Sequence, residues 1–405
     1  MSSSPSKAAA GSGAPVVRNV FLLAVCQALA QSGNVLNVAT TSLAAQILEG
    51  NDFYWTTLPV TMQHLGVMLS VYPAAMSGQR FGRSIGFGLG SLAGMAAGGL
   101  LSLAMWIGSF PLLCFGGLAM GYSIANMQLY RFAATELAPP VYRARAISYV
   151  TSAGVFAGLL GPAIARWTPD LLAHQFLATY LALVALHGLA LAVQRLIEFP
   201  QVKVEQEASG PQRPLSEIAR QPAFIVAALT AMASFGVMSF LMTASPLAIV
   251  ACGIDAREPP VTIFWHMMGM FAPAFVTGHL IGRFGVLNIM LLGLAILVAG
   301  AVVDLAGIDV WNFRVGLLLN GVGWNFAFVG ATTLVTTTYR PSEKGKTQAL
   351  NDFLVFGTTA TSSLLAGILQ QATGWSALNW FALPLIAMPI LAVLWLRLRP
   401  GAVAA

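Results

Sequence analysis

The chain has 405 residues, of which 57% are hydrophobic and only 8% carry a charge. Soluble domains carry about 25% charged residues, so this composition excludes a water-soluble globular protein. The net charge of +6 comes from residues on the flanks of long apolar runs, which excludes the continuous basic surface that nucleic-acid binding requires.

Residues 1–16 are rich in Ser, Ala and Gly and lack the regions and cleavage site of a signal peptide, so they are predicted to form a disordered cytoplasmic tail. Apolar runs of about 20 residues, enough to span a membrane, then recur along the chain. Lipid offers the backbone no hydrogen bonds, so these runs must be helical. The twelve predicted spans are 19–42, 56–78, 84–108, 110–135, 145–165, 176–197, 222–250, 260–281, 286–307, 312–337, 347–370 and 376–396.

The basic residues predict the orientation, because Lys and Arg beside membrane spans stay in the cytoplasm. With the N-terminus inside, 16 of the 20 Lys and Arg residues are cytoplasmic, and the outer loops hold acidic residues such as Glu258 and Asp304. We therefore expect a multi-pass protein of the bacterial inner membrane with both termini in the cytoplasm. The three cysteines have no paired spacing, so neither a disulfide framework nor a metal site is expected.

A hydrophilic stretch divides the spans into two sets of six. Residues 198–221 contain seven charges and three prolines and are predicted to form a cytoplasmic connecting loop. The predicted domains are a six-helix bundle over 17–197, this loop, a second bundle over 222–399 and a cytoplasmic tail over 400–405. An internal repeat supports the division, because Gln79-Arg80-Phe81-Gly82-Arg83 recurs as Gly282-Arg283-Phe284-Gly285 about half the chain length later.

The first copy of the repeat resembles the loop between helices 2 and 3 of the major facilitator superfamily, G-x-x-x-D-R-x-G-R-R/K. Arg80, Gly82 and Arg83 match this pattern, and three positions depart from it, namely Ala75, Gln79 and Ser84. In the family these charges latch the cytoplasmic helix ends, with an arginine pairing an acid at the end of helix 4. The resemblance implies a cytoplasmic gate formed by the three matching residues with Glu136, and by Arg283 in the second copy.

The resemblance extends from Arg18 to Arg399. The segment 139–146 is also similar to the family's P-x-E-R-G-R-A loop between helices 4 and 5. It implies an all-α membrane protein with twelve transmembrane helices in two pseudo-symmetric six-helix bundles. Second-half segments resemble a bacterial branch of the family whose substrates are poorly assigned, so no substrate is implied.

Polar side chains in the spans predict a solute site. The first span presents Gln27, Gln31, Asn34 and Asn37 at helical spacing, so these amides are expected to line a central cavity. The alternative is that they hydrogen-bond between packed helices. The lining is predicted to be extended by Asn126, Tyr130, Asn320, Trp324 and Asn325.

Ionisable groups inside spans are costly, so each is a candidate functional group. Asp352 and Arg131 lie at matched depth in the eleventh and fourth spans with opposite charge, which predicts an ion pair that takes part in proton coupling. The alternative is two independent structural charges. His266 is a further candidate proton carrier, since histidine titrates near neutral pH, although a packed histidine bonded to a neighbouring helix explains it equally well.

These features predict a secondary active transporter for a small organic solute that works by rocker-switch alternating access and is coupled to protons. No nucleotide-binding loop or hydrolase motif is present, so neither ATP-driven transport nor an enzyme is indicated. Gly161-Pro162 favours export, whereas Leu113 replaces an arginine common in drug exporters. An importer, an uncoupled facilitator and a membrane solute sensor remain alternatives. The expected partners are the solute, protons and membrane lipid. No cofactor is expected. The protein is expected to be a monomer.

Overall fold

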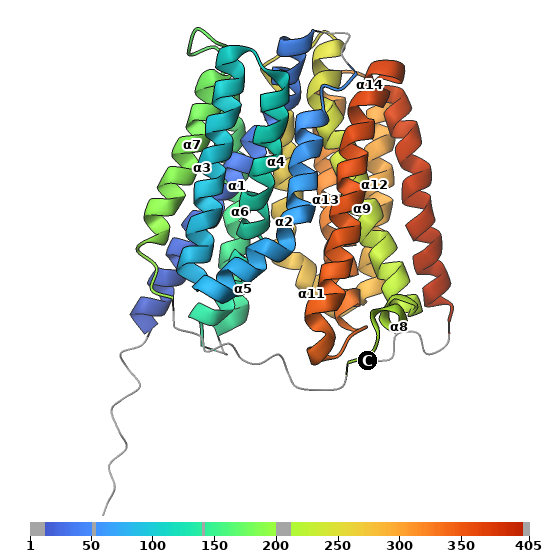
Figure 1. Cartoon of the computed structure of the whole chain (residues 1–405). Helices are drawn as coiled ribbons and strands as arrows, with labels where there is room; N and C mark the ends of the chain where they lie inside the picture. The colour runs from blue at the N-terminus through green and yellow to red at the C-terminus, as the bar shows by residue number, and fades with distance from the viewer. Residues whose placement is uncertain (1–12, 51–53, 140–141, 200–211, 400–405) are drawn as a thin grey trace, which may run out of the picture.

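The computed structural model describes residues 13–50, 54–139, 142–199 and 212–399. Within these ranges the regular secondary structure is helical and contains no strand. Most of the helices run roughly side by side through the bundle (Figure 1). Nine helices in the described part of the chain are long and apolar enough to cross a membrane. The all-α membrane fold predicted from the sequence is confirmed.

We call residues 13–199 the first half and residues 212–399 the second half. The first half contains α1 (Gly13–Glu49), α2 (Leu58–Phe81), α3 (Arg83–Ile107), α4 (Phe110–Met127), α5 (Tyr130–Leu137), α6 (Arg143–Trp167) and α7 (Leu177–Gln194). The second half contains α8 (Leu215–Ala219), α9 (Pro222–Ala251), α10 (Glu258–Phe271), α11 (Ala274–Phe284), α12 (Val286–Leu305), α13 (Val310–Thr336), the 3-10 helix η2 (Pro341–Glu343) and α14 (Lys344–Arg397).

Two predicted spans are each divided into two helices, and one long helix covers two further predicted spans. The span 110–135 is divided into α4 and α5, and 260–281 is divided into α10 and α11 beside Pro273, which has no backbone N–H to donate. Helix α14 has 54 residues, which would measure about 81 Å if straight. Gly374 interrupts it with φ 77° and ψ 178°, a conformation open to glycine, and separates the predicted spans 347–370 and 376–396.

The nine apolar helices account for ten of the twelve predicted spans. The other two predicted spans, 56–78 and 145–165, coincide with α2 and α6, which are less apolar. Both contribute to contacts between the halves, α2 against α14 and α6 against α10. A helix with protein on more than one face needs fewer apolar residues than one surrounded by lipid. The total of twelve spans stays a prediction.

The two copies of the sequence repeat have the same backbone geometry. Gly82 joins α2 to α3 with φ 86° and ψ 159°, and Gly285 joins α11 to α12 with φ 83° and ψ 151°. Only glycine adopts such angles without strain. Each glycine reverses the chain between two antiparallel helices at the end of the bundle where α1 begins and α14 ends (Figure 1). We call this the terminal end and the opposite end the far end.

Glycines also let helices pack closely at equivalent places in both halves. A Cβ atom added to Gly66 of α2 would collide with the backbone carbonyl of Leu118 in α4. A Cβ atom on Gly269 of α10 would collide in the same way with the carbonyl of Leu318 in α13. The two contacts lie about half the chain length apart, as the sequence repeat does. Tight helix pairs of this kind are typical of membrane proteins, in which small residues allow backbones to approach.

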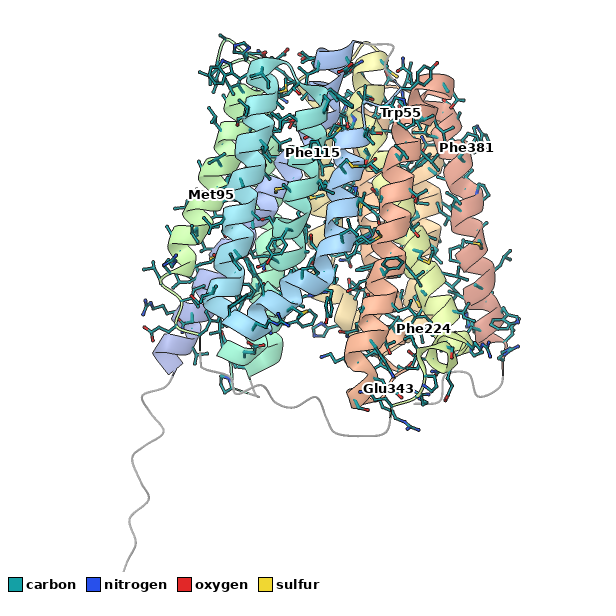
Figure 2. The ribbon with its side chains drawn as sticks, viewed as in Figure 1. Trp55, Met95, Phe115, Phe224, Glu343 and Phe381 are labelled. Carbon is teal, nitrogen blue, oxygen red and sulfur yellow. The ribbon has the colours of Figure 1, made fainter. Side chains whose placement is uncertain are left out.

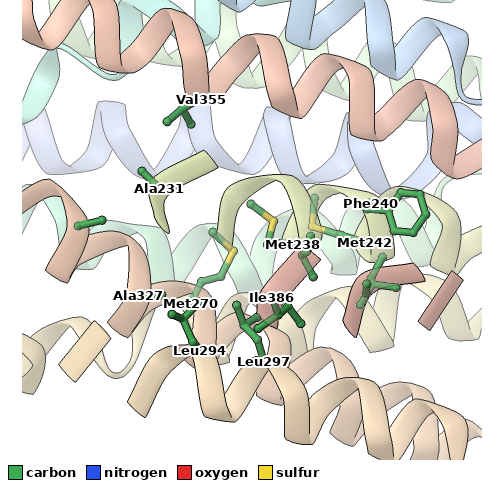
Figure 3. Close-up of a cluster of buried hydrophobic side chains, with 14 of the residues drawn as sticks. Ala231, Met238, Phe240, Met242, Met270, Leu294, Leu297, Ala327, Val355 and Ile386 are labelled. Carbon is green, nitrogen blue, oxygen red and sulfur yellow. The ribbon is translucent and has the colours of Figure 1, made fainter. Parts of the chain in front are cut away.

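The second half has the larger apolar core, shown in Figure 3. Methionines such as Met238 and Met270 meet Leu294, Leu297 and Ile386 there. Methionine is unbranched and adapts to irregular gaps. This packing joins the helices of the second half to one another, and α1 and α6 of the first half also contribute residues to it. The halves contact one another chiefly through α2 with α14, α6 with α10, and α1 with α9.

Candidate functional site

Four aromatic side chains form a cluster where the two halves meet; we call Phe235, Trp324, Phe328 and Phe356 the aromatic cluster. The rings of Trp324 and Phe328 are stacked, with centroids 5.1 Å apart and planes 12° apart. Phe235 meets Trp324, Phe328 and Phe356 edge to face at centroid distances of 5.4, 5.2 and 5.8 Å. Phe356 also packs against the core of the first half, whereas the other three pack against that of the second.

The aromatic cluster has unused binding capacity. All four side chains are partly exposed, so their rings are not fully covered by protein. The indole N–H of Trp324 is buried and has no hydrogen-bond partner among the described residues. Aromatic faces favour stacking with flat rings, and an indole N–H is a donor. The arrangement suits a planar solute with a hydrogen-bond acceptor at its edge.

Of the four amides predicted along the first span, two are hydrogen-bonded to a neighbouring helix and two are not. Asn34 is partly exposed, and its Oδ1 accepts a hydrogen bond from Gln63 Nε2 at 3.0 Å. Asn37 is fully buried, donates to Gln63 Oε1 and accepts from Thr41. Gln63 of α2 was not expected from the sequence and ties both amides to one neighbouring helix. Gln27 is partly buried and Gln31 is buried, and neither forms a hydrogen bond with the described residues.

Asn126 and Tyr130 lie in the packing of the first half, away from the aromatic cluster. Asn126 donates from Nδ2 to the Gly86 carbonyl at 2.9 Å. The hydroxyl of Tyr130 accepts a hydrogen bond from Gln194 at 2.5 Å, and its ring meets Phe87 edge to face. Both side chains are buried between α3, α7 and the α4–α5 pair.

The three polar residues predicted in α13 also separate. Asn325 donates to the Met270 carbonyl at 2.7 Å and accepts from Thr277 at 2.6 Å, so it fastens α13 to α10 and α11. Asn320 is buried, and neither its amide nitrogen nor its oxygen has a partner among the described residues. Trp324 alone of the three is partly exposed and belongs to the aromatic cluster.

Arg131 and Asp352 are close enough to interact electrostatically, although no ion pair within 4.0 Å joins them among the described residues. Asp352 accepts a hydrogen bond from Asn351 at 3.3 Å. The guanidinium of Arg131 is exposed and lies 4.9 Å from the ring centroid of Phe132. The ammonium of Lys344, in the second half, is 5.9 Å from the same centroid. The two halves therefore approach one another here through charged and aromatic groups.

His266 is enclosed at the contact between α10 and α13. Its Nδ1 lies 2.9 Å from the Leu317 carbonyl, and Nε2 is buried without a hydrogen-bond partner in the described part of the chain. The side chain is fully buried. This is the environment of a packed histidine bonded to a neighbouring helix, which is one of the two readings that the sequence left open.

The residues of the predicted gate lie at the terminal end. Arg83 binds Glu136 through two parallel hydrogen bonds of 3.0 and 2.6 Å, and both side chains are about a quarter exposed. Gly82 supplies the reversal before Arg83, and Arg80 is exposed. In the second copy, Arg283 lies 5.3 Å from the ring centroid of Phe284. The ion pair is therefore made in the first half only, within the described residues.

A second ionic cluster at the terminal end was not expected from the sequence. Glu343 is fully buried and accepts hydrogen bonds from the Arg213 guanidinium at 3.0 and 2.7 Å and from the backbone N–H groups of Arg213 and Arg340. Figure 2 shows Glu343 at this end of the second half. These bonds fasten the chain that leads into α8 to the start of α14, and Arg213 holds the pKa of Glu343 far below its ordinary value.

Replacing Glu343 by glutamine is expected to lower the melting temperature of the purified protein most strongly at neutral pH. A group whose pKa is depressed in the folded state stabilises it above the unfolded pKa, and that stability is lost as pH falls through the folded pKa. The ordinary pKa is 4.5, so the gap between wild type and Glu343→Gln should be constant near pH 7 and narrow below about pH 5. A thermal melt series across pH measures it. Glu217→Gln is the control, because this exposed carboxylate lies 3.9 Å from Arg213; a gap that widens towards acid would contradict the assignment.

A third ionic cluster lies at the far end; we call it the outer latch. Glu258 of α10 accepts a hydrogen bond of 2.5 Å from Arg314 of α13 and lies 3.8 Å from Arg166 of α6. Arg166 also donates to the Arg257 carbonyl at 3.0 Å. The latch therefore joins the first half, through α6, to the second half.

Asp304 corrects one prediction from the sequence. It was counted with the acids of the outer loops, although it also falls within the predicted span 286–307; it lies in the last turn of α12 and is 1% exposed. Its carboxyl group packs against Gly316 of α13, and neither oxygen has a partner in the described part of the chain. The missing side chain of Gly316 provides the space for it. The apolar run before Asp304 gave no sign of this contact with α13.

The fold and these sites define a class of protein. The family model described as Major Facilitator Superfamily matches residues 20–303. The chain belongs to this family, and it is therefore a multi-pass membrane transport protein.

Individual relatives agree with this assignment over nearly the whole chain. The chain is 40% identical to the "Riboflavin transporter RfnT" of Brucella anthropi over 390 residues, which cover 96% of this chain and 98% of the relative. It is 27% identical to the "Uncharacterized MFS-type transporter YdeG" of Bacillus subtilis, over 94% of this chain and 92% of that protein.

Solved structures share the fold at low sequence identity. A D-xylose-proton symporter superposes with a TM-score of 0.75 and 13% identity, covering 95% of this chain and 98% of the symporter. The human organic anion transporter MFSD10 superposes with a TM-score of 0.71 and 14% identity, over 94% of this chain and 99% of that protein.

Proposed function

We propose that this protein transports riboflavin, or a flavin of closely similar shape, across the bacterial inner membrane. The aromatic cluster carries the proposal, because a flavin has a flat three-ring system edged with carbonyl and N–H groups. The relative named as a riboflavin transporter supports this choice, since the two sequences are 40% identical along almost their entire lengths.

In this proposal the solute lies between the halves. The flavin ring stacks against Trp324, and the unpartnered indole N–H, which points along the plane of its own ring, donates to a hydroxyl of the flavin's side chain beyond the stacked ring. The amides of Gln27, Gln31 and Asn34 are proposed to bind the hydroxyl groups of the side chain. Asn37, Asn126, Tyr130, Asn320 and Asn325 are assigned a supporting role, because they are buried in the packing within a half.

Transport is proposed to occur by a rocker-switch movement of the bundles 17–197 and 222–399, connected by residues 198–221. The terminal end is assigned to the cytoplasm from the distribution of basic residues. The outer latch closes the opposite face in the described conformation. The gate residues Arg80, Gly82, Arg83, Glu136 and Arg283 are proposed to close the cytoplasmic face in the other state. Both states are populated when the free energies of the two conformations differ by only a few kcal/mol.

Proton coupling is proposed to use Asp352, with Arg131 as the nearby charge. Asp352→Asn cannot bind or release a proton, so it is expected to remove accumulation driven by a pH gradient while leaving solute exchange intact. One pH unit drives at most about tenfold accumulation for one proton per solute, so the accumulation ratio should fall from up to about ten to about one. Proteoliposomes with and without the gradient measure both quantities.

Two outcomes separate the roles in this experiment. If Asp352→Asn loses both solute exchange and accumulation, Asp352 is needed for folding or binding, and a role confined to coupling is contradicted. Retained accumulation in Asp352→Asn would exclude the residue as the proton carrier, and His266→Gln then becomes the variant to measure. The same vesicles give the direction of transport, because export by antiport and import by symport respond to opposite pH gradients. The Gly161-Pro162 pattern supports export.

The proposed substrate is tested in bacterial cells that cannot make riboflavin and lack their own carrier for it. Expression of the protein is expected to permit growth on low external riboflavin, or to lower the internal flavin content if the protein exports it. Cells that express the Trp324→Ala variant at equal membrane abundance serve as the control. If neither growth nor flavin content differs from that of cells with an empty vector, riboflavin is not the substrate.

A further inference from the structure

A cavity of about 380 Å³ opens at the far end, beside the outer latch. The ends of α1, α6, α9 and α10 and the loops after α6 and α9 enclose it, so both halves of the chain form its walls. Small-molecule sites in proteins range from about 300 to 1,000 Å³. The cavity is therefore large enough to hold one small solute, and α1 and α9, which contact one another across the two halves, both line it.

The walls of the cavity combine apolar surface with free polar groups. Apolar contacts come from Leu43, Phe176 and Val250, which suit one face of a flat ring. The amide of Gln46 and the guanidinium of Arg257 have no hydrogen-bond or ion-pair partner among the described residues. They can therefore bind carbonyl and hydroxyl oxygens of a solute without giving up an existing bond.

We propose that this outer cavity is a second flavin-binding subsite, separate from the aromatic cluster, in which the solute docks on the outer face. The proposal rests on the proposed function for the identity of the solute. An apolar wall with a few convergent polar groups is the usual composition of a small-molecule site. The flavin ring would lie against the apolar wall, with its polar edge and hydroxyl chain towards Gln46 and Arg257.

Docking here would act on the outer latch. Arg166 lines the cavity and belongs to the latch, where it is 3.8 Å from Glu258 and 3.0 Å from the Arg257 carbonyl. A solute oxygen that binds Arg166 competes with its long contact to Glu258 and with its hydrogen bond to the Arg257 carbonyl. A ligand shifts an equilibrium by its difference in affinity for the two states, so the docked solute favours opening of the latch.

The test uses cysteine labelling on the full-length protein with Cys26, Cys114 and Cys252 replaced by serine. Ala256→Cys places a thiol on an exposed loop residue that lines the cavity. Riboflavin at four times its dissociation constant is expected to slow labelling by a membrane-impermeant maleimide about fivefold. Ala306→Cys, exposed in another loop at the far end and outside the cavity, is the matched control and should label at an unchanged rate.

The decisive comparison adds Trp324→Ala, which disables the aromatic cluster. Protection of Ala256→Cys that persists in this background supports a separate outer subsite. Protection that disappears with Trp324, or is absent from the start, overturns it, because the effect would then come from the central site or not exist. Phe328→Ala replaces Trp324→Ala if the latter does not fold. Equilibrium binding of labelled riboflavin to the parent protein is measured first, and its absence would refute the proposed function itself.

Discussion

Replacing Trp324 by alanine is expected to raise the dissociation constant for riboflavin roughly 5- to 150-fold, because stacking of a flat base on an aromatic side chain contributes about 1 to 3 kcal/mol. Trp324 supplies both a ring face, stacked 5.1 Å from Phe328, and an indole N–H without a partner. Alanine removes both. Quenching of flavin fluorescence on titration of the purified protein measures the change.

Two further variants make this result specific to the site. Trp324→Phe keeps a ring and loses the indole N–H, so its loss of affinity should be smaller than that of alanine. Trp380→Ala is the matched control, because Trp380 in α14 is 64% exposed and lies outside the aromatic cluster. Equal loss of affinity in Trp324→Ala and Trp380→Ala would show a general effect of removing a tryptophan and would contradict the proposed site.

Replacing Gly66 by alanine is expected to destabilise the protein by about 3 kcal/mol or to prevent folding, at the upper end of the cost of overpacking a core. The new Cβ would collide with the Leu118 carbonyl, and this obstacle is backbone that cannot rotate away. Gly269→Ala should behave in the same way against the Leu318 carbonyl. Thermal melts and the folded yield in detergent measure the effect.

Gly99→Ala provides the control for both substitutions. Gly99 lies within α3, and a Cβ atom added there would meet nothing within 4 Å. Alanine is the better helix former by about 1 kcal/mol, so this variant should be as stable as wild type or slightly more stable. If Gly99→Ala were as harmful as Gly66→Ala, loss of a glycine in itself, rather than the collision, would explain the result.

The fold was largely predictable from the sequence because lipid permits few alternatives. Apolar runs long enough to cross the membrane must be helical, and the repeat about Arg80 and Arg283 predicted two related halves. The structure gives the glycines of this repeat, Gly82 and Gly285, nearly identical backbone angles. The predicted acid at the end of the fourth span, Glu136, does receive hydrogen bonds from Arg83.

The candidate site was predicted less completely, for a physical reason. A helix inside a membrane bundle has protein on several faces, so an amide at helical spacing can point into a cavity or into a neighbouring helix. Asn325 binds the Met270 carbonyl, whereas Trp324, the residue before it, is partly exposed. Sequence spacing alone does not separate these cases. Phe235, Phe328 and Phe356 were missed because single aromatic residues in apolar runs carry no distinguishing pattern.

Counterflow measures whether this protein carries a flavin through a site between its halves. Purified protein is placed in liposomes preloaded with unlabelled riboflavin, and labelled riboflavin is added outside. A flavin transporter is expected to give a saturable, transient accumulation of label inside the liposomes. This accumulation should be lost in Trp324→Ala and retained in Trp380→Ala. Label that enters no faster than into liposomes without protein, under conditions in which the protein is folded, would contradict flavin transport by this protein.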